Sequence, residues 1–209
     1  MMKKELDINN WNRKEHFKFF NSFTEPFYGV CITVDCTKAY QYAKENGHSF
    51  FLYYLHKSLA AANNIEPFRY RIEENQVFVY DKINASPTIN RPNGTFGFGY
   101  MEYYEDFALF VQEAKKEIER IQNTTALLPS ATYGENLIHY SSIPWIDFQS
   151  LSHARNFAFP DSCPKISFGK MTKNSTGLQM PVSIHVNHAL MDGYHVGQFI
   201  DLYQQLLNE

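Results

Sequence analysis

Apolar residues recur with helical spacing in three stretches of the chain, and cap residues predict a fourth helix. In residues 105–122 they fall every three or four positions and leave glutamate and lysine on the opposite face, which predicts an amphipathic helix. Ser49 is a suitable N-cap for a second helix over residues 50–63, and Gly47 is placed to end a shorter helix over residues 37–46. The same spacing predicts a closing helix over residues 196–207.

Short runs rich in valine, isoleucine and aromatic residues predict strands. Residues 68–72 pair with 76–80 in a hairpin pattern, and residues 87–89 pair with 95–101 around Asn93-Gly94, which favours a tight turn. We therefore expect antiparallel sheet in the middle of the chain. Further strands are predicted at residues 27–34, 138–142, 165–170 and 179–188, a polar turn at 172–177 and a loop at 127–137, whereas 146–163 show no clear pattern.

This uneven mixture of strands and helices predicts an α+β fold. We expect a two-layer sandwich in which helices cover a mostly antiparallel or mixed sheet, because the repeating βαβ order of a doubly wound fold is missing. The length of 209 residues suits a single domain spanning 1–209. Aromatic residues make up 16% of the chain, enough to leave apolar surface beyond one core, and oligomerisation would cover that surface.

Charge and hydropathy exclude several classes of partner. The formal net charge is -3 and no stretch concentrates lysine and arginine, so we expect no nucleic-acid partner. No apolar run approaches the roughly 20 residues of a membrane-spanning helix, and the first residues are polar where a signal peptide needs apolar ones, so we expect a cytoplasmic protein. Cys31, Cys36 and Cys163 lack metal-ligand spacing and are predicted to be reduced, buried thiols.

Residues 184–195 carry the strongest chemical signal in the sequence. His188 ends a predicted strand, and a histidine mounted there can project into a cleft as a general base. The alternative is a core histidine that bonds a nearby carbonyl. Asp192 would either orient an imidazole or pair with a cation and stiffen the turn, in which Gly193 can take a conformation that other residues avoid.

Other common catalytic patterns are missing from the sequence. His185, His188 and His195 lack the regular spacing and the carboxylate of a metal site, so no metal is expected. A Gly-x-Ser-x-Gly elbow, a dinucleotide-binding glycine motif and a Walker-type phosphate loop do not occur. These absences disfavour a serine-hydrolase or nucleotide-dependent mechanism.

Three separated motifs match those of one family in the same order. They are Asn-Trp-Asn-Arg-Lys-Glu-His-Phe at 10–17, Ser-Ser-Ile-Pro-Trp-Ile-Asp-Phe at 141–148 and His-Ala-Leu-Met-Asp-Gly-Tyr-His at 188–195. The chain resembles the type A chloramphenicol acetyltransferases, within the coenzyme A-dependent acyltransferase superfamily. The resemblance extends over nearly the whole chain.

The resemblance implies an acetyl-CoA-dependent O-acetyltransferase that forms a homotrimer with three active sites, each at a junction between subunits. His188 would take the proton from the hydroxyl of a small-molecule acceptor, which attacks the thioester directly. Ser141 would donate a hydrogen bond to the oxyanion of the tetrahedral intermediate. Asp192 would pair with Arg13 in a buried ion pair and would not relay a proton.

Three further positions take a role from the resemblance. Ser167 lies where the family usually has a threonine that helps to hold an active-site water. Lys170 matches a lysine near the coenzyme A phosphates, although a solvated lysine at a strand end is an equal alternative. Trp145, in the central motif, is assigned to the coenzyme A site.

Several departures from the family pattern concern the acceptor pocket. The family commonly has two histidines where this chain has Asn187-His188, which leaves the catalytic position intact. The positions aligned with His153 and Arg155 are apolar in the family, Phe98 replaces a small residue beside Phe96, and Tyr28 alters another wall. Because an unpaired guanidinium buried against a nitrophenyl group is unfavourable, these changes predict a polar or anionic acceptor, or poor use of chloramphenicol.

Two alternative functions stay open. One is acyl transfer to a thiol, as in the dihydrolipoamide acyltransferase core, although the chain has no room for a lipoyl domain and linker. The other is a non-catalytic module that sequesters chloramphenicol or a similar ligand, against which the presence of both His188 and Ser141 argues.

Overall fold

The computed structural model describes residues 2–128, 134–158 and 160–209. The α-helices in this part of the chain are α1 (Lys14–Phe20), α2 (Thr37–Glu45), α3 (Phe50–Asn64), α4 (Phe107–Gln122) and α5 (Gly193–Leu207), with short 3-10 helices at Ile8–Asn10 and Glu66–Arg69. A small sheet has the strand order β1 (Lys3–Glu5), β4 (Gln76–Tyr80) and β3 (Tyr70–Glu73).

A larger sheet runs through the centre of the molecule. Its strand order is β2 (Phe27–Asp35), β10 (Gly177–Asn187), β8 (Lys165–Phe168), β7 (Leu137–Ser142), β5 (Asn84–Asn90) and β6 (Phe96–Phe98), and β9 (Thr172–Asn174) pairs with the first part of β10. Parallel pairing joins β5 to β7 and β7 to β8, and the other pairs are antiparallel. The predicted α+β class and mixed sheet are confirmed.

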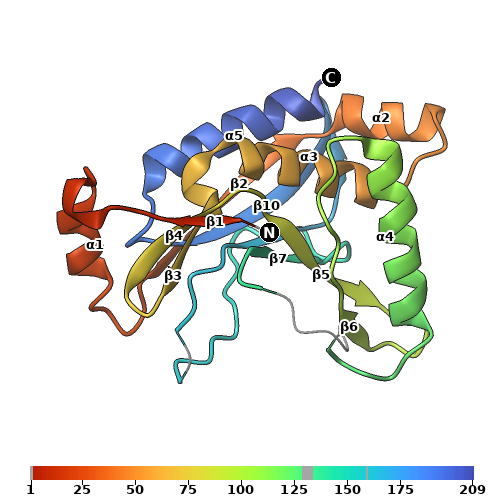
Figure 1. Ribbon diagram of the computed structural model, residues 1–209. Coiled ribbons are helices and arrows are strands. Elements are labelled where there is room, and N and C mark those ends of the chain that lie inside the picture. Colours follow the sequence, from red (N-terminus) through yellow and green to blue (C-terminus); the bar gives the residue numbers. More distant parts are fainter. Residues whose placement is uncertain (1, 129–133, 159) are drawn as a thin grey trace.

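Helices cover one face of the large sheet. Figure 1 shows α3 and α5 on one side of β2 and β10, with α4 beside β5 and β6, while the segment that joins β7 to β8 lies on the opposite side. Successive side chains of β10 point to opposite faces of the sheet. Val182, Ile184 and Val186 point toward the helices and belong to the core beneath them. The opposite face carries polar side chains, among them those of Ser167 and Ser183.

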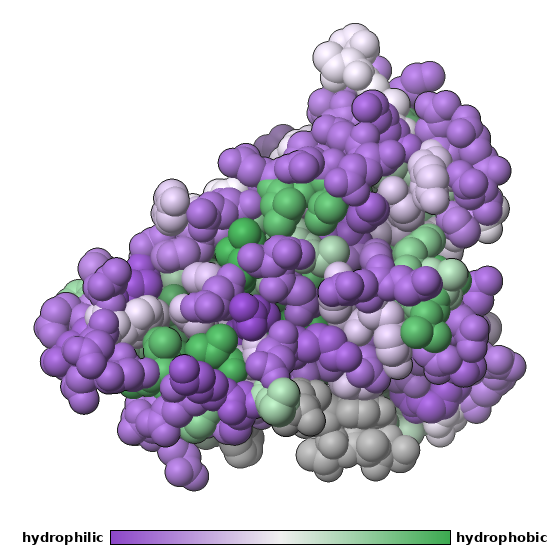
Figure 2. Space-filling view, turned by 45° about the horizontal axis from the view of Figure 1, so that its top comes forward, coloured by the Kyte–Doolittle hydropathy of each residue, from purple (hydrophilic) through white to green (hydrophobic). Residues whose placement is uncertain are grey.

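The predicted helices form where caps and apolar stripes place them. The Ser49 side chain accepts a hydrogen bond from the Leu52 N–H, and Asp106 caps α4 by accepting from the Leu109 N–H at 2.8 Å. Gly47 and Gly94 both have the positive φ that the sequence predicted for a helix end and a tight turn. The side shown in Figure 2 is largely hydrophilic, with hydrophobic residues in small separate groups.

Several predictions of local structure need correction. Phe68 belongs to a 3-10 helix and not to the strand that follows it, because Pro67 stands within that short helix. Gly193 does not have a positive φ; it is the first residue of α5, with Asp192 as the N-cap. Antiparallel pairing holds for both central hairpins, but β5 continues into a parallel pair with β7, which strand pattern alone does not reveal.

Other expectations concern the connecting segments. The polar stretch predicted as a turn at 172–177 also contains the short strand β9. Part of the predicted loop at 127–137, residues 129–133, lies outside the described residues. All three cysteines are free thiols, with Cys36 and Cys163 buried and Cys31 half-buried. Among the described residues, no helix combines the length and apolar character needed to cross a bilayer.

Candidate active site

The end of β10 holds His188 at a fixed place. The His188 backbone N–H donates to the Pro26 carbonyl at 2.8 Å, which ties the residue to the start of β2. The Asn187 side-chain oxygen accepts from the Ala189 N–H at 2.9 Å, and the Asn187 carbonyl accepts from the Leu190 N–H at 3.0 Å. These bonds shape the short turn between β10 and α5, so Asn187 has a structural role beside the histidine.

The His188 ring is oriented by one hydrogen bond and two aromatic neighbours. Its Nδ1 lies 3.2 Å from the Met191 carbonyl oxygen. Because a carbonyl oxygen can only accept, Nδ1 carries the hydrogen and Nε2 is left as the acceptor. The ring stacks on Phe20 with 3.9 Å between centroids and packs against Tyr28 at 4.6 Å. The arrangement gives the imidazole the tautomer that a general base requires.

Arg13 and Asp192 form an ion pair behind this ring. The Arg13 Nη2 donates to the His188 carbonyl at 3.1 Å. The guanidinium therefore links His188 to Asp192, the N-cap of α5. The Asp192 carboxylate also accepts from the Tyr194 N–H at 3.1 Å and lies 2.9 Å from His195 Nδ1. Burial acts to raise the pKa of Asp192, but the charges of Arg13 and His195 and the hydrogen bonds from Arg13 and the Tyr194 N–H together outweigh burial, and the pKa is lowered.

This ion pair differs in one respect from the buried pair that the resemblance implies. The side chain of Arg13 is 11% exposed, whereas that of Asp192 is 35% exposed. Among the described residues, the carboxylate accepts hydrogen bonds from Arg13 and from the Tyr194 N–H, and none of its hydrogen bonds reaches the His188 ring. The arrangement therefore lacks the contact of a Ser-His-Asp triad.

Ser141 lies in a row of small polar residues that crosses the sheet. The register places it beside Ser167 of β8, which in turn lies opposite Ser183 of β10. Ser167 is fully buried, and its hydroxyl has no hydrogen-bond partner among the described residues. This row lies on the face of the sheet turned away from the helices.

One chain does not bring His188 and Ser141 together. The chain from Ser183 to His188 extends about 16 Å along β10, and two strand spacings separate β10 from β7 by about 10 Å, which places the two residues roughly 19 Å apart. No single substrate carbonyl can touch both side chains of the same chain.

The two predicted coenzyme A residues lie near Ser141. Trp145, 69% exposed, follows β7, and the exposed Lys170 follows the adjacent parallel strand β8. The Lys170 N–H donates to the Ile146 carbonyl at 2.8 Å, so the two segments run together past the strand ends. Both side chains thus extend from the sheet edge at which β7 and β8 end.

The predicted acceptor-pocket residues fall into three places. His153 and Arg155 help to line a cavity of about 130 Å³, together with Glu25, Phe27, Ser152, Lys165 and His185. Phe96 and Phe98 lie on the edge strand β6, where Phe98 is opposite Thr88 of β5. Tyr28 packs on His188 of its own chain, and burial raises its pKa to about 12.

The expectation that the Arg155 guanidinium is unpaired is wrong. Its Nη1 donates to the Glu25 carboxylate at 2.6 Å, its Nε lies 3.7 Å from Asp161, and its central carbon lies 3.7 Å above the Phe27 ring. Glu25 is 130 residues away from Arg155 in the sequence, so no local pattern of residues indicates this pairing.

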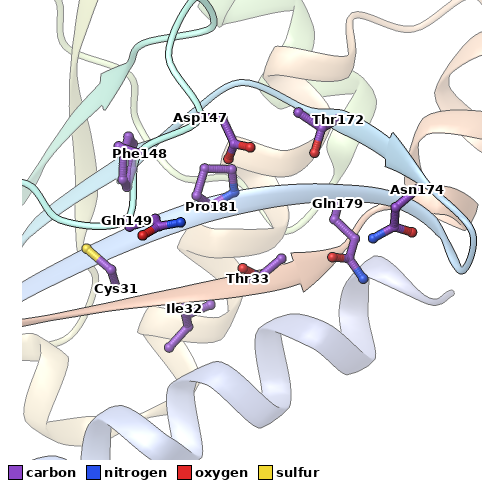
Figure 3. A pocket seen from close by; sticks show the side chains of 10 residues that line it. All are labelled: Cys31, Ile32, Thr33, Asp147, Phe148, Gln149, Thr172, Asn174, Gln179 and Pro181. Atoms are coloured by element: carbon purple, nitrogen blue, oxygen red, sulfur yellow. The ribbon is translucent and has the colours of Figure 1, made fainter.

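A second, larger cavity of about 410 Å³ lies on the same face of the sheet. Figure 3 shows the residues of β2, β10, β9 and the segment after Trp145 that line it: Cys31, Ile32, Thr33, Asp147, Phe148, Gln149, Thr172, Asn174, Gln179 and Pro181. None of the site residues predicted from the sequence lines this cavity. In the described part of the chain, no three histidine, cysteine or acidic side chains are grouped to hold a metal ion.

Comparison with known proteins identifies the family. The model of the family described as chloramphenicol acetyltransferase matches residues 1–204. A chloramphenicol acetyltransferase of a Klebsiella species is 30% identical over 208 residues, covering 98% of this chain and 93% of that protein. A solved structure of a chloramphenicol acetyltransferase covers 99% of this chain and all of its own, with a TM-score of 0.91 and 34% identity.

A dihydrolipoamide acetyltransferase of Azotobacter vinelandii has the same fold at 14% identity, with a TM-score of 0.67 over 93% of this chain and 86% of its own. That likeness concerns the fold alone. The full-length matches above decide the assignment: the chain is an acetyltransferase enzyme of the chloramphenicol acetyltransferase family.

Proposed function

We propose that the protein transfers the acetyl group of acetyl-CoA to a hydroxyl of a small-molecule acceptor, with His188 as general base. The observation that carries this proposal is the Met191 carbonyl at His188 Nδ1, because it leaves Nε2 free to accept a proton. The acceptor hydroxyl gives its proton to Nε2 as its oxygen bonds to the thioester carbonyl carbon. The tetrahedral intermediate then collapses, the C–S bond breaks and the coenzyme A thiolate takes the proton back from the imidazolium.

In this proposal the Ser141 hydroxyl donates a hydrogen bond to the oxyanion of the tetrahedral intermediate. The Ser141 side chain shares a face of the sheet with that of Ser167, and Trp145 and Lys170 follow the ends of the same two strands, where we place coenzyme A. A preorganised donor of this kind contributes roughly 3 kcal/mol to transition-state stabilisation.

We further propose that the active sites lie between subunits of a homotrimer. Support comes from the distance of roughly 19 Å between His188 and Ser141 within one chain. In an oligomer, His188 of one subunit could instead lie close to Ser141 of its neighbour. Exposed aromatic side chains near these residues, Phe19 and Phe23 close to α1 and Trp145 after β7, offer apolar surface for such a contact. Transfer to a thiol, or binding without catalysis, has no comparable support in the site.

Thiol release from acetyl-CoA with a panel of hydroxylated acceptors tests the reaction. We expect His188→Ala to lower turnover by about 10³-fold or more, since it removes the proton acceptor, while unfolding temperature and oligomeric state stay the same. His48→Ala, a histidine in the turn before α3, is the matched control and should keep normal turnover. Near-normal turnover of His188→Ala would refute the assignment of the base, and no release with any acceptor would favour a binding module.

A further inference from the structure

The cavity of about 130 Å³ lies on the same face of the sheet as Ser141, because Lys165 and His185, which line it, share that face. His139, Lys165 and His185 lie side by side on β7, β8 and β10, and each is two residues before or after a serine of the row that contains Ser141. Residues two apart on a strand share a face and are about 7 Å apart. The cavity therefore begins roughly 8 Å along and across the sheet from the proposed oxyanion donor, within reach of an acceptor that extends toward Ser141.

The charges around this cavity compensate one another. Arg155 contacts the carboxylates of Glu25 and Asp161, and Lys165 donates to Asp161 and to the Cys163 carbonyl. Two cations thus face two carboxylates, and neither cation is left free for an anionic group. An anionic acceptor would have to break an existing pair.

The histidines here act as neutral hydrogen-bonding groups. Burial, assisted by the positive charge of Lys165, lowers the pKa of His139 to about 4, and burial beside His185 lowers that of His153 to about 4. A neutral imidazole offers one donor and one acceptor. The Nε2 of His153 is buried and has no hydrogen-bond partner among the described residues, so it is available to a ligand.

The backbone is shaped to hold this cluster. A side chain at Gly29 would bring a carbon within 2.2 Å of the His185 Nε2, so the ring of His185 needs a glycine at that position of β2. The His153 ring then packs edge-on against His185 with 4.7 Å between centroids. These contacts hold the rings of His153 and His185 in place at the wall of the cavity.

We propose that the acceptor is a neutral, hydroxyl-rich molecule of the carbohydrate or polyol class, bound by the side chains of His153, Arg155 and Lys165 beside Ser141. This inference rests on the acetyltransferase function proposed above and narrows its substrate. Paired charges and neutral imidazoles supply many donors and acceptors for hydroxyl groups, and a nitrophenyl ring would leave these polar groups without partners.

Thiol release from acetyl-CoA can be compared for three neutral polyols, methyl glucoside, methyl galactoside and myo-inositol, for methyl glucuronide, an anionic uronic acid, and for chloramphenicol. We expect at least one neutral polyol to exceed both the uronic acid and chloramphenicol in kcat/KM by about tenfold or more. A higher kcat/KM for chloramphenicol or the uronic acid would overturn the polyol assignment and leave the acetyltransferase intact. No release with any acceptor would overturn the acetyltransferase proposal and the acceptor assignment with it.

Variants of His153 test the contact itself. His153→Leu should lower kcat/KM for the preferred polyol by about tenfold, the effect of one lost hydrogen bond, and should not lower it for chloramphenicol. His153→Gln, which keeps a donor and an acceptor, should recover most of the loss, and His48→Leu should change neither value. Equal losses for both acceptors, or no loss, would contradict a direct role for His153.

Discussion

The ring of His188 is fixed by contacts that reach across the whole chain. Met191 sets its tautomer, Phe20 stacks on it from α1, and Arg13 holds its carbonyl. The sequence placed His188 at a strand end and suggested a base, but it could not reveal the stacking of Phe20, because no periodic pattern connects α1 with the end of β10. In contrast, the alternation of polar and apolar residues in β7 and β8 could have placed His139 and Lys165 on the same face as Ser141.

Replacing Arg13 should change stability in a pH-dependent way. The pKa of Asp192 is lowered in the folded protein. Its ionised form therefore stabilises the fold at pH values above the pKa of an unfolded aspartate, and this stabilisation is lost as the pH falls through the folded pKa. Because the carboxylate is 35% exposed, we expect Arg13→Met to cost about 1 kcal/mol near neutral pH, less than for a fully buried pair.

Thermal unfolding of wild type and Arg13→Met between neutral pH and about pH 3 tests this expectation. The unfolding temperatures should differ by about 2 to 4 °C near neutral pH and should converge in acid. Lys38→Met, a change on the exposed face of α2, serves as the control. A difference that grows as the pH falls would contradict the role given to the ion pair.

At the scale of elements, the ends of the two parallel strands organise the proposed coenzyme A site. The segment after β7 passes close over the end of β8, and Gly169 makes this approach possible: a side chain there would come within 2.9 Å of the Ile146 carbonyl and 2.6 Å of Pro181. The sequence predicted both strands, but their parallel pairing depends on long connections whose path the pattern of residues does not encode.

Gly169→Ala should therefore displace the segment that carries Trp145. We expect KM for acetyl-CoA to rise severalfold, with a smaller effect on KM for the acceptor, in steady-state assays that vary one substrate at a time. Gly197→Ala is the matched control, since a side chain at that position of α5 meets no atom within 4 Å and alanine is the better helix former. Equal KM values for acetyl-CoA in wild type and Gly169→Ala would contradict a role of the Trp145 segment in coenzyme A binding.

At the scale of the whole molecule, we propose that each chain supplies two half-sites. The helices cover one face of the large sheet, and the opposite face carries the serine row, both cavities and the segment with Trp145 (Figure 1). The family match spans residues 1–204. A single domain over 1–209 and a homotrimer both stay predictions, and the distance between His188 and Ser141 within one chain supports a site shared between subunits.

Complementation between two inactive variants tests the shared active site most directly. His188→Ala and Ser141→Ala would each be purified alone, and both would be co-expressed so that subunits mix in one oligomer. In a random mixture, about one quarter of the junctions join an intact His188 to an intact Ser141 of the neighbour. The account predicts that thiol release from acetyl-CoA rises to about one quarter of the wild-type rate, far above either variant alone; a mixture no more active than its parents, in oligomers shown to contain both variants, would contradict it.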